Sequence, residues 1–455
     1  MDMTDITVRN LLYWICPQSL RKYWDGVQAS SISSRMVHGA FWSLGGAVIS
    51  RVPMLLAFIC VARILGRNVY GEFGVIRNTL NMFLVFAGFG LGLTATKYVA
   101  EYRCSDPNRT GRILALSGVF AAGSGALVAM GMYIFSPWLA SHTINAPHLA
   151  GELRLGAVVL FLSALNGAQT GALAGFEAFK TIAKINIIVG LASFPTLVCG
   201  SYWGGLHGAI LALCANMSFS WLLNHLALRR VAACYMVPFT TRGCFAEWSV
   251  LWKFSLPAAL SGIMVSPIFW VCNAILVNQP GGYGQMGIYD AASQWQAIIL
   301  FIPGVVGQIV LPILSNLNGL AEQKKSLKII YYNLMVNGGI SCVIALPLVA
   351  FSPFIMRSYG AGFEQGTSTL VILSVCTVFI SLNNVIGQSI ASKSRMWSGL
   401  LLNSLWAATL LLSSFFLLRS GYGATGLALA NLIAYLLHTI FVSVYAYKLF
   451  RGQRV

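Results

Sequence analysis

Acidic side chains are scarce in this chain. Asp and Glu together number 12 of 455 residues, and all charged residues make up only 9% of the sequence. A soluble globular domain carries roughly a quarter charged residues. The composition therefore excludes an ordinary water-soluble enzyme and indicates a protein whose surface lies largely in lipid.

Signatures of catalysis and of metal binding are also missing. The chain has no GxxxxGK[ST] loop for nucleotide phosphates, no GxSxG or HExxH motif, and no CxxC pair among its 10 cysteines. Its 6 histidines do not fall at the spacing of metal ligands. We therefore expect no enzymatic activity, no catalytic residue, no metal and no cofactor.

Long apolar runs fill the sequence instead. Hydrophobic residues make up 57% of it, and its mean hydropathy is +0.74. A helix needs about 20 apolar residues to cross a bilayer, so the runs predict an all-α integral membrane protein with about twelve transmembrane helices. The predicted spans are 36–63, 73–97, 112–136, 154–176, 184–203, 206–228, 251–277, 287–314, 329–350, 367–391, 397–418 and 425–447.

The basic residues predict the orientation of these spans. Most of the 29 Lys and Arg fall in the termini and in the loops after even-numbered spans. Cytoplasmic loops of membrane proteins are enriched in these residues, so both termini are expected in the cytoplasm, and the net charge of +17 indicates no nucleic-acid partner. The opposite loops hold only Arg63, Arg67, Arg154, Arg357 and Arg419.

An internal repeat divides the chain into two halves. Residues 70–74 (YGEFG) match 283–287 (YGQMG) at an offset of 213, between the first two spans of each half. Parallel repeats of six helices around a central cavity are typical of transporters. The expected organisation is a cytoplasmic segment, which is either an interfacial helix or an unstructured tail, then an N-lobe, a linker, a C-lobe and a tail. Their ranges are 1–35, 36–229, 230–250, 251–448 and 449–455.

Among the charged residues of the predicted spans, three stand out as candidates: Arg51, Arg77 and Asp290. An ionised side chain there normally faces a cavity or a partner. The repeat makes Arg77 and Asp290 equivalent, and each has an amide four residues later, on the same helix face (Asn81 and Gln294). One interpretation is a cleft that binds an anionic cargo, since arginine pairs well with phosphate. The other is a purely structural pair between the lobes.

The chain then shows a family resemblance. Residues 62–73 (ARILGRNVYGEF), 90–102 (GLGLTATKYVAEY) and 169–177 (QTGALAGFE) resemble segments of Wzx-type O-antigen flippases, members of the multidrug/oligosaccharidyl-lipid/polysaccharide exporter superfamily. The resemblance implies a MATE-like fold in a bacterial inner membrane. It also implies transport of an undecaprenyl-diphosphate-linked oligosaccharide to the periplasmic leaflet, with membrane lipids, the O-antigen polymerase and a chain-length regulator as partners.

Candidate substrate-binding residues are therefore Arg51, Arg63, Arg77, Asn81, Asp290 and Gln294. Asp290 is also the candidate for coupling to a proton or sodium gradient. A peptidoglycan-precursor flippase and a drug or ion antiporter of the same superfamily remain alternatives. A membrane-embedded glycosyl-transfer enzyme is disfavoured, because the longest outer loop, near 137–153, is too short for such an active site.

Overall fold

The computed structural model describes residues 31–238, 243–255, 263–304, 323–393 and 395–451. Its regular elements are all helical over these residues, and the N-terminal segment expected at 1–35 lies almost wholly outside them. The long helices of the first half are α3 (Ser31–Gly88), α4 (Leu91–Tyr102), α5 (Pro107–Trp138), α6 (Ala150–Gly175) and α7 (Phe179–Cys234). Those of the second half are α9 (Val265–Val277), α10 (Gly282–Ile299), α12 (Gln323–Ala350), α13 (Ser352–Ser358), α14 (Thr367–Ser392), α15 (Met396–Arg419) and α16 (Gly423–Arg451).

Short helical turns join several of these helices. They are η1 (Leu139–Thr143), η2 (Pro147–Leu149), η3 (Cys244–Glu247), η4 (Leu251–Ser255) and η5 (Glu364–Gly366). Within the described residues, eight helices are long and apolar enough to cross a membrane. Large side chains such as Leu127 and Leu401 are 73% exposed. Exposed apolar surface on this scale is expected where lipid is the solvent.

Two of the long helices are broken by a glycine. Gly66 in α3 has φ 74°, and Gly205 in α7 has φ 56°. A residue without a Cβ adopts these backbone angles at no steric cost. In α3 the arms before and after the break contact each other, since the ring centroids of Phe58 and Phe73 lie 6.2 Å apart. Each broken helix therefore acts as two arms.

The structure corrects the predicted boundary between the first two spans. Residues 64–72 were expected as a loop, but they are helical on both sides of the break at Gly66. Their charges lowered the hydropathy, and the structure places bonding partners beside them: Arg63 Nε donates to the Ser358 carbonyl oxygen at 2.5 Å, and Arg67 Nη1 donates to Gln365 Oε1 at 3.2 Å. The helix therefore extends through the charged residues.

Two other predicted boundaries also shift. The span expected from residue 287 begins earlier, since α10 starts at Gly282. Of the span expected at 251–277, the described residues form η4 (Leu251–Ser255) and α9 from Val265 onward, and residues 256–262 lie outside the description. The positive φ of Gly281 explains the first shift, because it ends the preceding turn and starts α10 before the apolar run does.

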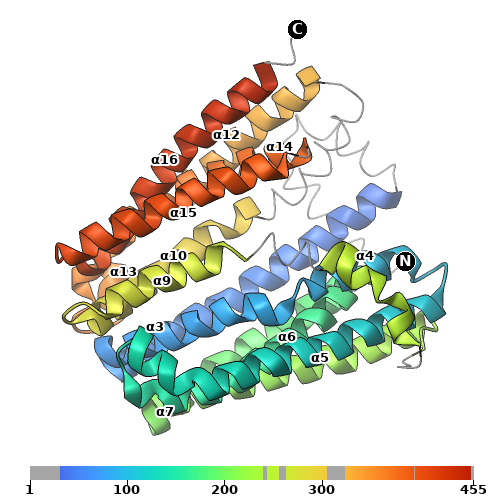
Figure 1. The fold of residues 1–455 in the computed structure, drawn as a ribbon, viewed down its shortest axis with the longest axis horizontal. Helices are drawn as coiled ribbons and strands as arrows, with labels where there is room; N and C mark the ends of the chain where they lie inside the picture. Colours follow the sequence, from blue (N-terminus) through green and yellow to red (C-terminus); the bar gives the residue numbers. More distant parts are fainter. Residues whose placement is uncertain (1–30, 239–242, 256–262, 305–322, 394, 452–455) are drawn as a thin grey trace.

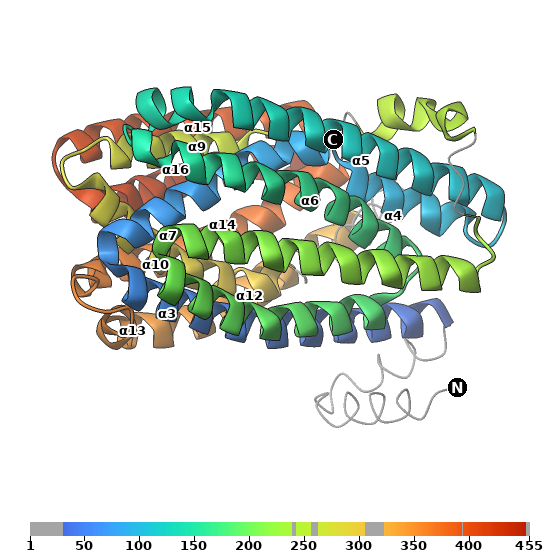
Figure 2. The ribbon, with the colours of Figure 1, turned by 90° about the horizontal axis from the view of Figure 1, so that it is seen from below.

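Figure 1 shows α3, α5, α6 and α7 side by side in its lower part and α12, α14, α15 and α16 in its upper part, with α9 and α10 between them. We call the end near the Gly66 break, η1 and α13 the Gly66 end. The end where α3 begins and α16 finishes is the termini end. Figure 2 shows the same long, nearly parallel helices from below.

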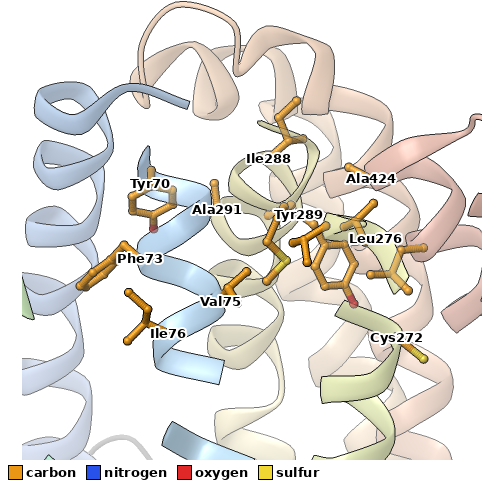
Figure 3. Close-up of a cluster of buried hydrophobic side chains, with 14 of the residues drawn as sticks. Tyr70, Phe73, Val75, Ile76, Cys272, Leu276, Ile288, Tyr289, Ala291 and Ala424 are labelled. Carbon is orange, nitrogen blue, oxygen red and sulfur yellow. The ribbon is translucent and has the colours of Figure 1, made fainter. Parts of the chain in front are cut away.

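The buried core lies where the first half meets the second. Figure 3 shows side chains from α3, α9 and α10 meeting there, among them Phe73, Ile76, Leu276 and Tyr289. All four are at most 5% exposed. The contact between α3 and α10 is thus a packed interface, and it carries the candidate site.

Candidate functional site

Glycines let α3 and α10 approach each other closely. A Cβ on Gly71 would overlap the Tyr283 carbonyl oxygen, and one on Gly287 would overlap the Arg67 carbonyl oxygen. The two YGxxG motifs of the repeat therefore pack against each other. Close backbone approach through small residues is a common way for helices to associate in membranes.

One helical turn beyond this crossing, Arg77 meets Asp290. Arg77 Nη2 lies 2.8 Å from Asp290 Oδ1 and 3.0 Å from Oδ2. The Asp290 side chain is 2% exposed, whereas that of Arg77 is 18% exposed. The carboxylate is thus buried, and the Arg77 side chain keeps some accessible surface.

Two further groups hold the Arg77 guanidinium. Its Cζ lies 4.5 Å from the centroid of the Phe58 ring, a favourable cation–π distance. With the Gln294 amide turned so that its oxygen faces the guanidinium, that oxygen accepts from Arg77 Nη1 at 3.0 Å. The cation is therefore oriented by a carboxylate, an amide and an aromatic face.

Arg51 contacts the same side of α10 further along. Its Nη1 donates to the Ala297 carbonyl oxygen at 3.1 Å, and its Cζ lies 4.1 Å from the centroid of the Phe301 ring. Residues 290, 294 and 297 are spaced i, i+4 and i+7, so they form one stripe of the helix. Arg77 and Arg51 thus meet this stripe about 10 Å apart, at 1.5 Å of rise per residue.

Two other predicted site residues, Asn81 and Arg63, lie apart from the contacts that Arg77 and Arg51 make with α10. Asn81 is exposed on α3, one turn after Arg77. Arg63 lies before the break at Gly66, where it contacts the Ser358 carbonyl oxygen. Arg63 therefore belongs to the contacts that join the two halves at the Gly66 end.

Sequence reasoning missed the aromatic residues around the site. Phe58 lies in an apolar run without any signal that distinguishes it from its neighbours. Trp270 on α9 donates from Nε1 to Thr79 Oγ1 at 2.9 Å, two residues from Arg77. The one signal that could have identified Trp270 is its place within a predicted span, because a buried indole N–H usually needs a hydrogen-bond partner.

Several known proteins are similar to this chain in sequence. Residues 36–318 match the family model described as polysaccharide biosynthesis protein. The chain is 24% identical to the EPS I polysaccharide export inner membrane protein EpsE of Ralstonia nicotianae, covering 86% of this chain and 89% of that protein. It is 22% identical to the lipid III flippase of Escherichia coli, over 62% of this chain and 68% of that protein.

Solved structures share the fold. An inward-facing multidrug resistance MATE family transporter of the MOP superfamily matches with a TM-score of 0.74, at 14% identity, over 91% of this chain and 98% of that one. The lipid II flippase MurJ in an inward closed conformation matches with a TM-score of 0.70, at 16% identity, over 90% of this chain and 87% of that one. The helices therefore adopt the fold of that superfamily.

Proposed function

Because the chain belongs to the polysaccharide biosynthesis protein family, we propose that it is a flippase for undecaprenyl-diphosphate-linked O-antigen repeat units. The cargo moves from the cytoplasmic to the periplasmic leaflet of the inner membrane. Its relatives support transport rather than catalysis, since they are named as a polysaccharide export protein and a lipid III flippase.

The physical problem is the headgroup of the cargo. A charged diphosphate with attached sugars is costly to place in hydrocarbon, whereas the polyprenyl tail is soluble there. In this proposal two six-helix lobes, 36–229 and 251–448, joined by the linker 230–250, alternate in exposing a central site. Both termini lie in the cytoplasm, as the basic loops predict.

The observation that carries the proposal is the pair of guanidiniums along one stripe of α10. Arg77 and Arg51 both contact that stripe, and each keeps accessible surface. A diphosphate accepts charge-assisted hydrogen bonds from such donors. In this proposal phosphate oxygens replace Asp290 as the partner of Arg77, and the freed carboxylate takes up a proton or sodium ion.

A deletion experiment tests this function. Loss of the gene should remove high-molecular-weight surface polysaccharide from gels, while lipid-linked repeat units accumulate in the cytoplasmic leaflet. The same lesion in a polymerase leaves single repeat units on the cell surface. Repeat units that still reach the periplasm in the deletion strain would contradict a flippase and favour a role in polymerisation.

A further inference from the structure

A pocket separate from the Arg77 site opens at the Gly66 end. It has a volume of about 410 Å³, within the range of about 300–1,000 Å³ typical of ligand sites. Helices α9 and α15 form most of its wall, and Thr143 of η1 completes it. The pocket therefore touches both halves of the chain, and neither Arg51 nor Arg77 lines it.

The lining changes from apolar to polar along the pocket. Trp270, Ala274 and Phe415 belong to its apolar part, at deeper positions of α9 and α15. The pocket-lining Phe415 is itself 40% exposed, and its neighbour in the chain, Phe416, is 66% exposed. Such a wall suits a hydrocarbon chain that enters sideways from the bilayer.

The polar part lies where α9 and α15 end. Asn278 and Gln279 follow the last residue of α9, and Arg419 is the last residue of α15. Arg419 is exposed and stacks its Cζ 4.4 Å from the centroid of the Phe415 ring. It forms no ion pair with any carboxylate in the part of the chain that the structure describes.

We infer that this pocket binds an anionic phospholipid of the bilayer. Its phosphate pairs with the Arg419 guanidinium, and one acyl chain lies along α9 and α15 beside Ala274. An arginine fork matches a phosphate in geometry and in charge. A bilayer lipid is the occupant because the apolar lining includes Phe415, which is itself partly exposed and adjoins the exposed Phe416.

The bound lipid bears on how the two halves are held together. Asn278 Nδ2 at the pocket rim donates to the Thr143 carbonyl oxygen at 2.7 Å, and this bond joins α9 to η1. Trp270 in the wall reaches Thr79 on α3. A lipid that fills the space beside these contacts stabilises this junction between the two halves.

Native mass spectrometry of the purified full chain tests the inference, with phosphatidylglycerol as the probe. Arg419→Gln and Ala274→Trp should each weaken the first phosphatidylglycerol bound by about tenfold, the effect of losing one charge-assisted contact or the space for the chain. Diacylglycerol, which has no phosphate, should bind Arg419→Gln as it binds the unaltered protein.

The matched control is Arg154→Gln. Arg154 is also an exposed arginine over an aromatic ring, 5.3 Å from the Tyr133 centroid, but it does not line the pocket. Equal losses in Arg154→Gln and Arg419→Gln would overturn the site, and they decide the question even if Ala274→Trp fails to fold. Displacement of the lipid by undecaprenyl phosphate or by inorganic phosphate alone would overturn the assignment to a bilayer phospholipid.

Discussion

Arg77 and Asp290 differ in how deeply their side chains are buried. The Asp290 side chain is 2% exposed and that of Arg77 18% exposed, so the desolvation cost falls mainly on Asp290. Removing one member of a buried pair costs about 3–5 kcal/mol, because the other charge is left without a partner. A structural role of the pair and a role in binding cargo can therefore be distinguished by comparing the removal of Arg77 alone with the removal of both charges.

Arg77→Met alone should therefore lower the melting temperature, and Arg77→Met combined with Asp290→Asn should restore most of it. The double variant leaves no unpaired charge, and Asn retains the shape of Asp. Thermal unfolding in detergent measures both effects. A double variant as unstable as the single one would show that the ion pair is not the source of the loss.

The sequence predicts that Arg77 and Asp290 are equivalent but not that they touch. Equivalence follows from the two YGxxG motifs at an offset of 213. Contact requires that the axis relating the two halves pass between the two residues, and no sequence pattern reports the position of that axis. Arg51 was found as a charge within a span, yet its bond to the Ala297 carbonyl oxygen could not be predicted, because any backbone carbonyl is chemically the same.

At the scale of helices, the crossing of α3 and α10 depends on glycine. Gly71→Ala should separate the helices and destabilise the fold, because the new Cβ would overlap the Tyr283 carbonyl oxygen, a backbone atom that cannot rotate away. Gly118→Ala on α5 is the matched control, since a Cβ there meets nothing within 4 Å. It should be neutral or gain up to about 1 kcal/mol from higher helix propensity. Melting temperatures of the two variants give the comparison, and equal values would contradict the close crossing.

Hydropathy locates some helices well and fails at others for a physical reason. The predicted spans 367–391 and 397–418 coincide within a residue or so with α14 and α15, which carry no charged residue within those spans. The hydropathy prediction fails at 64–72 because hydropathy depends only on the residues of the segment itself, and charged residues lower it. The residues that accept hydrogen bonds from Arg63 and Arg67, Ser358 and Gln365, lie almost 300 positions away in the sequence.

For the whole molecule, the proposed orientation puts the termini end in the cytoplasm. A fluorescent protein fused after Val455 should fluoresce, and alkaline phosphatase fused there should be inactive. Phosphatase inserted after Asn145, at the Gly66 end, should be active, because that end is expected in the periplasm. The reverse pattern of activities would invert the proposed direction of transport.

The most direct measurement of the central claim is translocation by the purified protein in liposomes. Labelled lipid-linked oligosaccharide in the inner leaflet should become accessible to an external glycosidase faster with the unaltered protein than in protein-free liposomes. The double variant, Arg77→Met with Asp290→Asn, should translocate the cargo at least about tenfold more slowly, because a charge-assisted contact to the diphosphate is removed. A double variant as fast as the unaltered protein would show that Arg77 serves structure alone and would contradict the account.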